Sequence, residues 1–255
     1  MKLAAVFAHI MMIWCIATNV DAAISFTPSV NSANGRSAPI IKIYGKITQA
    51  DIQQFNVLME AAKLSAKSAG IHLADRTPVL VALDSPGGSV SAAIAIGQAI
   101  RAVNPFLVTV QASASCVSSC VLLLAGGVTR GVWGRVGIHR PYIDDDSTFT
   151  VAGQKQSYAE IEKAVKAYLA SVNIPTSLYD SMFRIPPEKV RFLSATEMQD
   201  FGLNEDDPYY KEARDAEQAK KLNLTKSEYQ RRYEACSSQS RMEAAACLIK
   251  LHNHR

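Results

Sequence analysis

The feature that most constrains the fold of this chain is the segment at residues 79–83, Val-Leu-Val-Ala-Leu, in which every residue is apolar. A strand without a polar position is typical of a parallel sheet that is covered on both faces. The segment ends at the turn Asp-Ser-Pro-Gly-Gly-Ser, residues 84–89, and residues 91–103 then show a helical pattern. A buried strand, a short glycine turn and a helix make the first half of a βαβ unit. A parallel sheet is therefore expected.

Strands and helices alternate on both sides of this unit. The other expected strands are residues 39–45, 107–110 and 134–138. The other expected helices are residues 51–68, a short apolar helix that opens near Ser118, and residues 159–172, 176–183 and 195–201. This alternation predicts an α/β fold of βαβ repeats, with right-handed crossovers and a mainly parallel sheet.

The first 22 residues have the pattern of a signal peptide. Lys2 gives a positive start, residues 3–20 are apolar, and Val20-Asp21-Ala22 fits a small-residue cleavage site. The alternative is an uncleaved membrane anchor, since about 18 apolar residues could just span a bilayer. Cleavage is the preferred interpretation, and it predicts a periplasmic or secreted protein without stable membrane insertion.

Composition divides the rest of the chain into three parts. Residues 23–37 are polar and are expected to form a leader, residues 38–205 contain the strand and helix patterns, and residues 206–255 are expected to form a charged helical C-terminal extension. Hydrophobic residues make up 48% and charged residues 20% of the chain, which excludes disorder over most of it. The net charge of +4 is mild and scattered, so no nucleic-acid partner is expected.

Export changes the interpretation of the cysteines, because exported proteins mature in an oxidising compartment. After removal of the signal peptide the cysteines are Cys116, Cys120, Cys236 and Cys247, which allow three pairings. The simplest pairing is local, Cys116 with Cys120 and Cys236 with Cys247. The second bond would join two tail helices around a turn at residues 237–240, whereas the first two sulfurs could instead stay reduced. No CxxC pair is present, so a metal site is not expected.

A candidate nucleophile lies in the segment Cys-Val-Ser-Ser-Cys at residues 116–120. Ser118 precedes a short apolar helix, and a developing negative charge at that place would be favoured by the helix dipole. Ser119 and Ser115 compete for the same role. A serine near a helix start also has a plain structural explanation, since serine is a common N-cap.

A candidate base and a candidate oxyanion site accompany this serine. His139 follows the expected strand 134–138, and imidazole, with an ordinary pKa near 6.5, suits a general base. Gly87 and Gly88 follow the buried strand 79–83, where backbone without Cβ can present N–H groups to a ligand. Because parallel strands end at one edge of a sheet, these residues are expected at a common site. Serine, histidine and backbone donors are the parts of an acyl-transfer site.

Four motifs in this order resemble the Clp protease catalytic subunit and its crotonase-like relatives. They are SPGGS (residues 85–89), a serine with apolar residues and LAGG (118–127), IHRP (138–141), and RFLSA followed by FGL (191–203). The resemblance covers about residues 38–205 and implies a Clp/crotonase-like core. It also implies a serine peptidase that acts on peptide or protein substrates and needs no metal or organic cofactor.

The resemblance also assigns roles to individual residues. It implies that Ser118 is the nucleophile, that His139 is the base, and that the amides of Gly88 and Ser119 form the oxyanion hole beside Gly87. Members of the family build rings, and the expected helices at 51–68 and 159–172 carry apolar stripes. A homo-oligomer is therefore expected.

Two positions depart from the family pattern. Clp proteins carry an aspartate immediately before the RFLSA-like segment, and this chain has Val190 there. Glu188 is the first candidate for a substitute acid, and Asp180 and the acidic run at residues 144–146 are the alternatives. Cys120 replaces a glycine that the family pattern has two residues after the nucleophile. The flanking cysteines and the signal peptide resemble exported bacterial Clp-like proteins.

Two other functions are considered beside the peptidase, whose activity could be reduced by the lost acid. A binding or scaffold protein that keeps the fold without catalysis would explain Val190 directly. An acyl-CoA enzyme of the wider crotonase fold is disfavoured, because coenzyme A is an intracellular cofactor and because Ser118 and His139 would then lack a role.

Overall fold

The computed structural model of this 255-residue chain describes residues 23–32, 35–73, 76–142 and 151–253. The predicted signal peptide at residues 1–22 and the acidic run at residues 144–146 lie outside the described residues. Within the described ranges, no helix is both long enough and apolar enough to cross a membrane.

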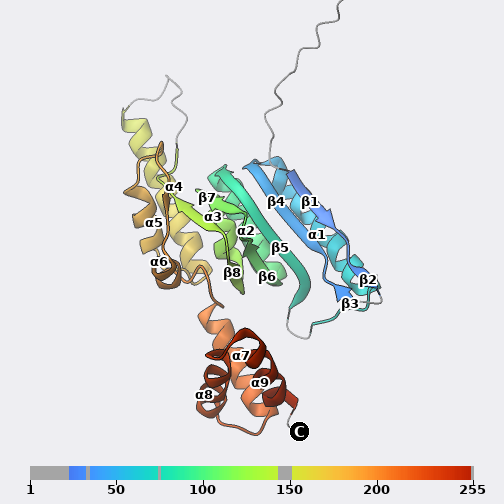
Figure 1. Ribbon diagram of the computed structural model, residues 1–255. Coiled ribbons are helices and arrows are strands. Elements are labelled where there is room, and N and C mark those ends of the chain that lie inside the picture. Colours follow the sequence, from blue (N-terminus) through green and yellow to red (C-terminus); the bar gives the residue numbers. More distant parts are fainter. Residues whose placement is uncertain (1–22, 33–34, 74–75, 143–150, 254–255) are drawn as a thin grey trace, which may run out of the picture.

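Most of the strands belong to a single mixed sheet (Figure 1). Its strands are β1 (Ala23–Thr27), β4 (Ile40–Ile47), β5 (Thr77–Gly88), β6 (Pro105–Val110), β7 (Ser115–Val117), β8 (Arg130–Val132), β9 (Arg135–Ile138) and β10 (Arg191–Phe192). Neighbours follow the order β1-β4-β5-β7-β9-β10, while β6 pairs with β5 and β8. The pairs β1–β4 and β9–β10 are antiparallel and the other pairs are parallel, which confirms the predicted mainly parallel sheet.

Residues 23–37 are not the polar leader that composition suggested. Strand β1 pairs with β4 over its full length, and β2 (Val30–Ser32) pairs with β3 (Gly35–Ser37) in a separate two-stranded sheet. Ile24 is buried and Phe26 packs against the core, so apolar residues alternate with Ser25 and Thr27 as in a strand with one buried face. The leader prediction failed because this short alternation was outweighed by the polar residues around it.

Strand β5 is the centre of the sheet and has two different neighbours on one side. Its first part pairs with β6, with Ala82 opposite Thr109 as the last pair. Further along, Ser85 pairs with Cys116 of β7 instead. On its other side, β5 stays paired with β4 as far as Gly88. The sheet therefore divides beyond Ala82, and the end of β5 lies beside the start of the segment that carries Ser118.

Three helices pack against β5 and bear out the expected helical segments. They are α1 (Ala50–Ser68), α2 (Val90–Val103) and α3 (Cys120–Gly126). All residues of α3 are buried, as its wholly apolar sequence requires. On α1 the expected apolar stripe, with Phe55, Met59 and Ala62, is buried in the core of this chain. That stripe is therefore not available for assembly, and the homo-oligomer stays a prediction.

A second group of helices lies beside α2, which its first member contacts. It consists of α4 (Val151–Ser171), α5 (Ser177–Phe183) and α6 (Ala195–Asp200). The Tyr168 hydroxyl of α4 donates a hydrogen bond of 2.8 Å to the carbonyl of Leu122 in α3. Burial raises the pKa of Tyr168, so this hydroxyl remains a donor. Ser194 begins α6 with a capping box to Glu197.

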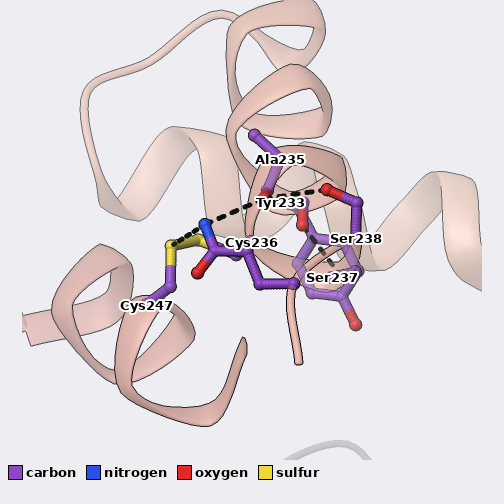
Figure 2. The surroundings of a disulfide bond; sticks show 7 residues. Tyr233, Ala235, Cys236, Ser237, Ser238 and Cys247 are labelled. Atoms are coloured by element: carbon purple, nitrogen blue, oxygen red, sulfur yellow. Dashed lines mark hydrogen bonds between the residues drawn. A yellow bond between two sulfur atoms is a disulfide. The ribbon is translucent and has the colours of Figure 1, made fainter. Parts of the chain in front are cut away.

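The C-terminal extension is helical, as predicted. It contains α7 (Pro208–Lys221), α8 (Lys226–Ser237) and α9 (Arg241–Asn253), which group at one end of the molecule away from the sheet (Figure 1). A disulfide joins Cys236 of α8 to Cys247 of α9 (Figure 2). At the end of α8, two serine hydroxyls also donate hydrogen bonds to backbone carbonyls, Ser237 to Tyr233 and Ser238 to Ala235. The predicted hairpin is thus confirmed, with its turn between residues 237 and 241.

Asp207 connects the extension to the α/β region. Its carboxylate accepts hydrogen bonds from Arg101 at 2.7 Å and Asn173 at 2.8 Å, and it also accepts from the amides of Tyr209 and Tyr210 at the start of α7. Burial opposes the charged form, but these hydrogen bonds outweigh it, and the pKa of Asp207 is lowered. One buried carboxylate therefore caps α7 and ties it to α2.

Candidate active site

Ser118 occupies a strained turn between β7 and α3. Its backbone has φ +59°, in the left-handed region. This conformation costs a residue other than glycine about 1–2 kcal/mol, and it persists only where the surroundings impose it. One such restraint is the hydrogen bond of 2.9 Å from the Ser118 amide to the carbonyl of Gly137. The turn leaves the Ser118 side chain half-buried at the wall of a cleft.

The neighbouring serine has a different environment. Helix α3 begins at Cys120, so the N-cap residue is Ser119 and not Ser118. The Ser119 hydroxyl makes no cap bond and donates instead to the carbonyl of Gly88 at 3.1 Å. It is 3% exposed, whereas Ser118 lines the cleft. Accessibility therefore favours Ser118 as the nucleophile over Ser119.

The glycine turn at the end of β5 lies directly against Ser118. A Cβ atom added to Gly87 would stand 2.7 Å from the Ser118 Cβ and 3.0 Å from the Ser119 amide nitrogen. Gly87 also has φ +96°, which other residues rarely adopt. Its own amide donates to the Ser85 hydroxyl at 3.1 Å. The turn thus brings Gly87 and Gly88 to the cleft wall and leaves space beside the Ser119 amide that no larger residue would leave.

His139 follows the end of β9, next to the strand that leads to Ser118. Strands β7 and β9 are parallel, with Val117 opposite Gly137, so Ser118 and His139 lie beyond the same ends of adjacent strands. The Nδ1 atom of His139 lies 2.7 Å from the carbonyl oxygen of Arg140. Because a carbonyl oxygen only accepts, Nδ1 carries the proton in this contact. The neutral ring then has its lone pair on Nε2, which is the tautomer that a general base needs.

Ser118 and His139 line the same cleft, whose volume is about 1120 Å³. The end of β4, the start of α2 and one face of α4 form its walls. The lining residues from these three elements include Lys46, Ile47, Val90, Ile94, Ile161 and Ala164. A smaller pit of about 20 Å³ adjoins the two residues, with mostly apolar walls. An extended chain fits such a cleft, and one small apolar group fits such a pit.

In the described part of the chain, neither Glu188 nor Asp180 makes a hydrogen bond to His139. Glu188 is exposed, and among the described residues it makes no hydrogen bond to the imidazole. Asp180 forms an ion pair of 2.8 Å with Lys166, and the hydrogen bonds that Lys166 donates to Asp180 and Glu162 raise the pKa of Lys166. The third candidate, residues 144–146, lies outside the described residues. The group that holds the ring is the Arg140 carbonyl, which sequence reasoning missed because every residue carries such a group.

The structure shows where an acid from the usual position would stand. Strands β9 and β10 are antiparallel, with Ile138 opposite Arg191. Continuing this register by one residue sets Val190 opposite His139. Val190 is 46% exposed, and its apolar side chain cannot accept a hydrogen bond from the imidazole. The position at which the family pattern predicts an acid therefore lies beside His139 in the strand register.

A disulfide between Cys116 and Cys120 encloses the Ser118 turn, as the local pairing predicted. Both cysteines are fully buried, and their Cα atoms lie 5.3 Å apart. Cys116 belongs to β7 and Cys120 is the first residue of α3. The bond therefore joins the strand before Ser118 to the helix after it.

The chain belongs to the Clp protease family. The family model described as Clp protease matches residues 61–206. Among solved structures, the chain is similar to a mutant of ClpP1 from Listeria monocytogenes, with 16% identity, 65% of this chain and 88% of that chain covered, and a TM-score of 0.47. It is also similar to a mutant of the membrane-bound stomatin-specific protease 1510-N, with 18% identity, 64% and 75% covered, and a TM-score of 0.44. No curated protein matches.

Proposed function

We propose a peptidase function for this chain, which belongs to the Clp protease family. In this proposal it is an exported enzyme that cleaves peptide bonds through an acyl-enzyme on Ser118. The observation that carries the proposal is the common cleft of Ser118 and His139, in which the base has its Nδ1 proton bound to the Arg140 carbonyl. Export rests on the signal-peptide pattern of residues 1–22.

The chemistry assigned to these residues is acyl transfer in two steps. Nε2 of His139 accepts the Ser118 hydroxyl proton while the serine oxygen attacks the scissile carbonyl. The amides of Gly88 and Ser119 donate to the resulting oxyanion. The protonated imidazole then gives its proton to the leaving amine. A water molecule, deprotonated by the same imidazole, hydrolyses the ester and restores Ser118.

The Arg140 carbonyl replaces only part of what a triad acid does. It fixes the ring orientation and the tautomer, but as a neutral group it offsets less of the positive charge that His139 gains. Converting the triad aspartate of a serine protease to its neutral amide costs about 10⁴-fold in kcat, partly through a wrong tautomer. Here the tautomer is correct, so we expect slow hydrolysis and not complete inactivity.

The substrate class follows from the shape of the cleft. The cleft between β4 and α4, with a volume of about 1120 Å³, has room for an extended peptide, and the pit beside Ser118 has room for one small apolar side chain. The apolar walls of the pit include Val90, Leu122 and Val165. We therefore expect cleavage after small residues such as alanine in preference to large or charged ones.

Hydrolysis of a fluorogenic peptide panel, varied at the residue before the scissile bond, tests this function. The wild-type chain and three single variants, Ser115→Ala, Ser118→Ala and Ser119→Ala, form the set. The expected result is release of fluorophore that is lost in Ser118→Ala and retained in Ser115→Ala. Equal rates in the wild-type and Ser118→Ala proteins would contradict the proposal.

The second candidate function is a non-catalytic binding protein that keeps the fold. The observation in its favour is Val190, which stands at the position of the expected acid. Such a protein would bind peptides in the same cleft without cleaving them. Peptide binding at wild-type affinity by every variant, with no turnover by any, would favour this second function.

A further inference from the structure

The disulfide beside the nucleophile has a second role in our account. We propose that the bond between Cys116 and Cys120 is a positioning element that holds Ser118 in its reactive conformation. This inference rests on the proposed function, in which Ser118 is the nucleophile. It assigns to two buried cysteines an effect on turnover and not only on stability.

The Ser118 turn needs an external restraint because its backbone conformation is unfavourable. A serine at φ +59° would relax if the residues around it moved apart. Relaxation would turn the Ser118 side chain and displace the Ser119 amide, which follows directly in the chain. Both the nucleophile and one oxyanion donor therefore depend on a single strained residue.

The restraint acts from both sides of the turn. Cys116 is held in the sheet, paired with Ser85 of β5 and with Val136 of β9. Cys120 begins α3, which is buried throughout. The disulfide fixes the distance between these two elements at 5.3 Å between Cα atoms, across the three residues of the turn. A covalent link at this point limits the turn more directly than its hydrogen bonds do, which are those of the Ser118 amide with Gly137, the Ser118 carbonyl with Val121 and the Ser119 hydroxyl with Gly88.

The same geometry predicts that the bond contributes little to overall stability. Cross-linking restricts the unfolded chain more when the closed loop is longer. Cys116 and Cys120 are four residues apart, whereas Cys236 and Cys247 are eleven apart. The tail disulfide is therefore the better global stabiliser, and it lies in α8 and α9, away from the cleft. This contrast supplies a matched control.

The test compares two double variants in the full mature chain. Cys116→Ala/Cys120→Ala removes the proposed positioning element, and Cys236→Ala/Cys247→Ala removes the control bond. Readouts are kcat, KM and the rate of covalent labelling by a fluorophosphonate probe. For the first variant we expect kcat and the labelling rate to fall by about 10- to 100-fold, as a displacement near 1 Å can cause, while KM stays within about twofold. The control should keep wild-type kcat.

Reduction of the protein provides a second route if the first variant does not fold. In the Cys236→Ala/Cys247→Ala background, the Cys116–Cys120 bond is the remaining one. Dithiothreitol supplies two electrons and two protons to make two thiols and becomes a cyclic disulfide itself. Reduction should lower the labelling rate. Removal of dithiothreitol and reoxidation of the two thiols by air should restore that rate. A reduced protein, verified by thiol alkylation, that labels at the oxidised rate would overturn the inference.

A conformational measurement separates this inference from the proposed function. Hydrogen exchange at the amides of residues 117–121 should accelerate in Cys116→Ala/Cys120→Ala and stay unchanged in the control. Unchanged exchange there overturns the positioning role, whether or not the chain is a peptidase. A wild-type chain that neither labels nor hydrolyses, but whose turn becomes mobile in the variant, would overturn the proposed function and leave the restraint on the turn established.

Discussion

Among single residues, the orientation of His139, the proposed base, depends on the main chain. The Arg140 carbonyl contacts Nδ1 of His139, and Val190 occupies the position opposite the ring. Ser118 carries backbone strain, and Gly87 leaves the space that the oxyanion donors need. Each of these features is local, so each can be tested by one substitution.

Val190→Asp should raise kcat. The register of β9 and β10 sets residue 190 opposite His139, where a carboxylate could accept a hydrogen bond from Nδ1–H and stabilise the imidazolium. We expect an increase of at least about tenfold, measured as peptide hydrolysis at pH 8. Glu188→Gln is the matched control and should leave kcat unchanged. A Val190→Asp protein that folds but hydrolyses no faster would show that the ring is not accessible from β10.

Gly87→Ala should remove activity by a steric effect. The added methyl group would clash with the Ser118 Cβ and approach the Ser119 amide, and φ +96° would strain an alanine backbone. Loss of one oxyanion donor alone costs about 10²–10³ in kcat. Peptide hydrolysis measures kcat of the variant, and circular dichroism shows whether the variant is folded. Near-normal kcat in a folded protein would show that the Ser119 amide is not used.

At the scale of elements, the division of the sheet at β5 creates the site. Strand β6 ends its pairing with β5 at Ala82, and β7 then pairs with Ser85 and leads into Ser118. Helix α3 is fixed behind the turn by the Tyr168 bond to Leu122. The positions of the nucleophile and the glycine turn therefore depend on the strand pairing and on the packing of α4.

The sequence was informative wherever a long periodic or apolar run existed. It predicted α1, α2, β5 and the tail helices, because burial imposes a pattern on every turn or every second residue. It did not predict β7, β8 or β10, which are two or three residues long and are stabilised by their neighbours in the sheet. Ser118, His139 and the glycine turn were recognised as motifs, whereas the Arg140 carbonyl has no signal in side-chain identity.

Tyr168→Phe should lower stability without changing KM. The variant removes one buried hydroxyl-to-carbonyl bond while keeping the ring. A buried hydrogen bond of this kind contributes about 1 kcal/mol, which corresponds to about 2–4 °C in Tm for a chain of this size. Differential scanning calorimetry beside peptide hydrolysis measures both effects. An unchanged Tm would mean that water replaces the hydroxyl at the Leu122 carbonyl.

At the scale of the whole molecule, the helical extension is held to the α/β region through a few polar contacts. Asp207 is 1% exposed and is bonded to Arg101 and Asn173, while Arg214 of α7 forms an ion pair with Asp206. The tail disulfide stabilises α8 and α9 within the extension. The extension is therefore attached by the buried pair of Asp207 and Arg101 and by backbone contacts of Asp206 with Thr129 and of Asp207 with Val128.

This attachment should weaken in acid. The pKa of Asp207 is lowered in the folded chain. The carboxylate therefore stabilises the fold at a pH above the ordinary aspartate pKa, and this stabilisation is lost as the pH falls below about 4. Asp207→Asn, which can still cap α7, should have a lower Tm at pH 7 but a smaller loss of Tm between pH 5 and pH 3. Asp200→Asn, which replaces an exposed aspartate, should show the same dependence of Tm on pH as the wild-type protein. Equal losses of Tm between pH 5 and pH 3 in all three proteins would contradict the role of Asp207.

Mass spectrometry of the mature chain after reaction with a fluorophosphonate tests the central claim most directly. We expect one covalent adduct, mapped to the peptide that contains Ser118, with slow but complete labelling. The adduct should be absent in Ser118→Ala, strongly reduced in His139→Ala, and retained in Ser115→Ala. An adduct on Ser119, or no adduct on a folded protein, would contradict the account.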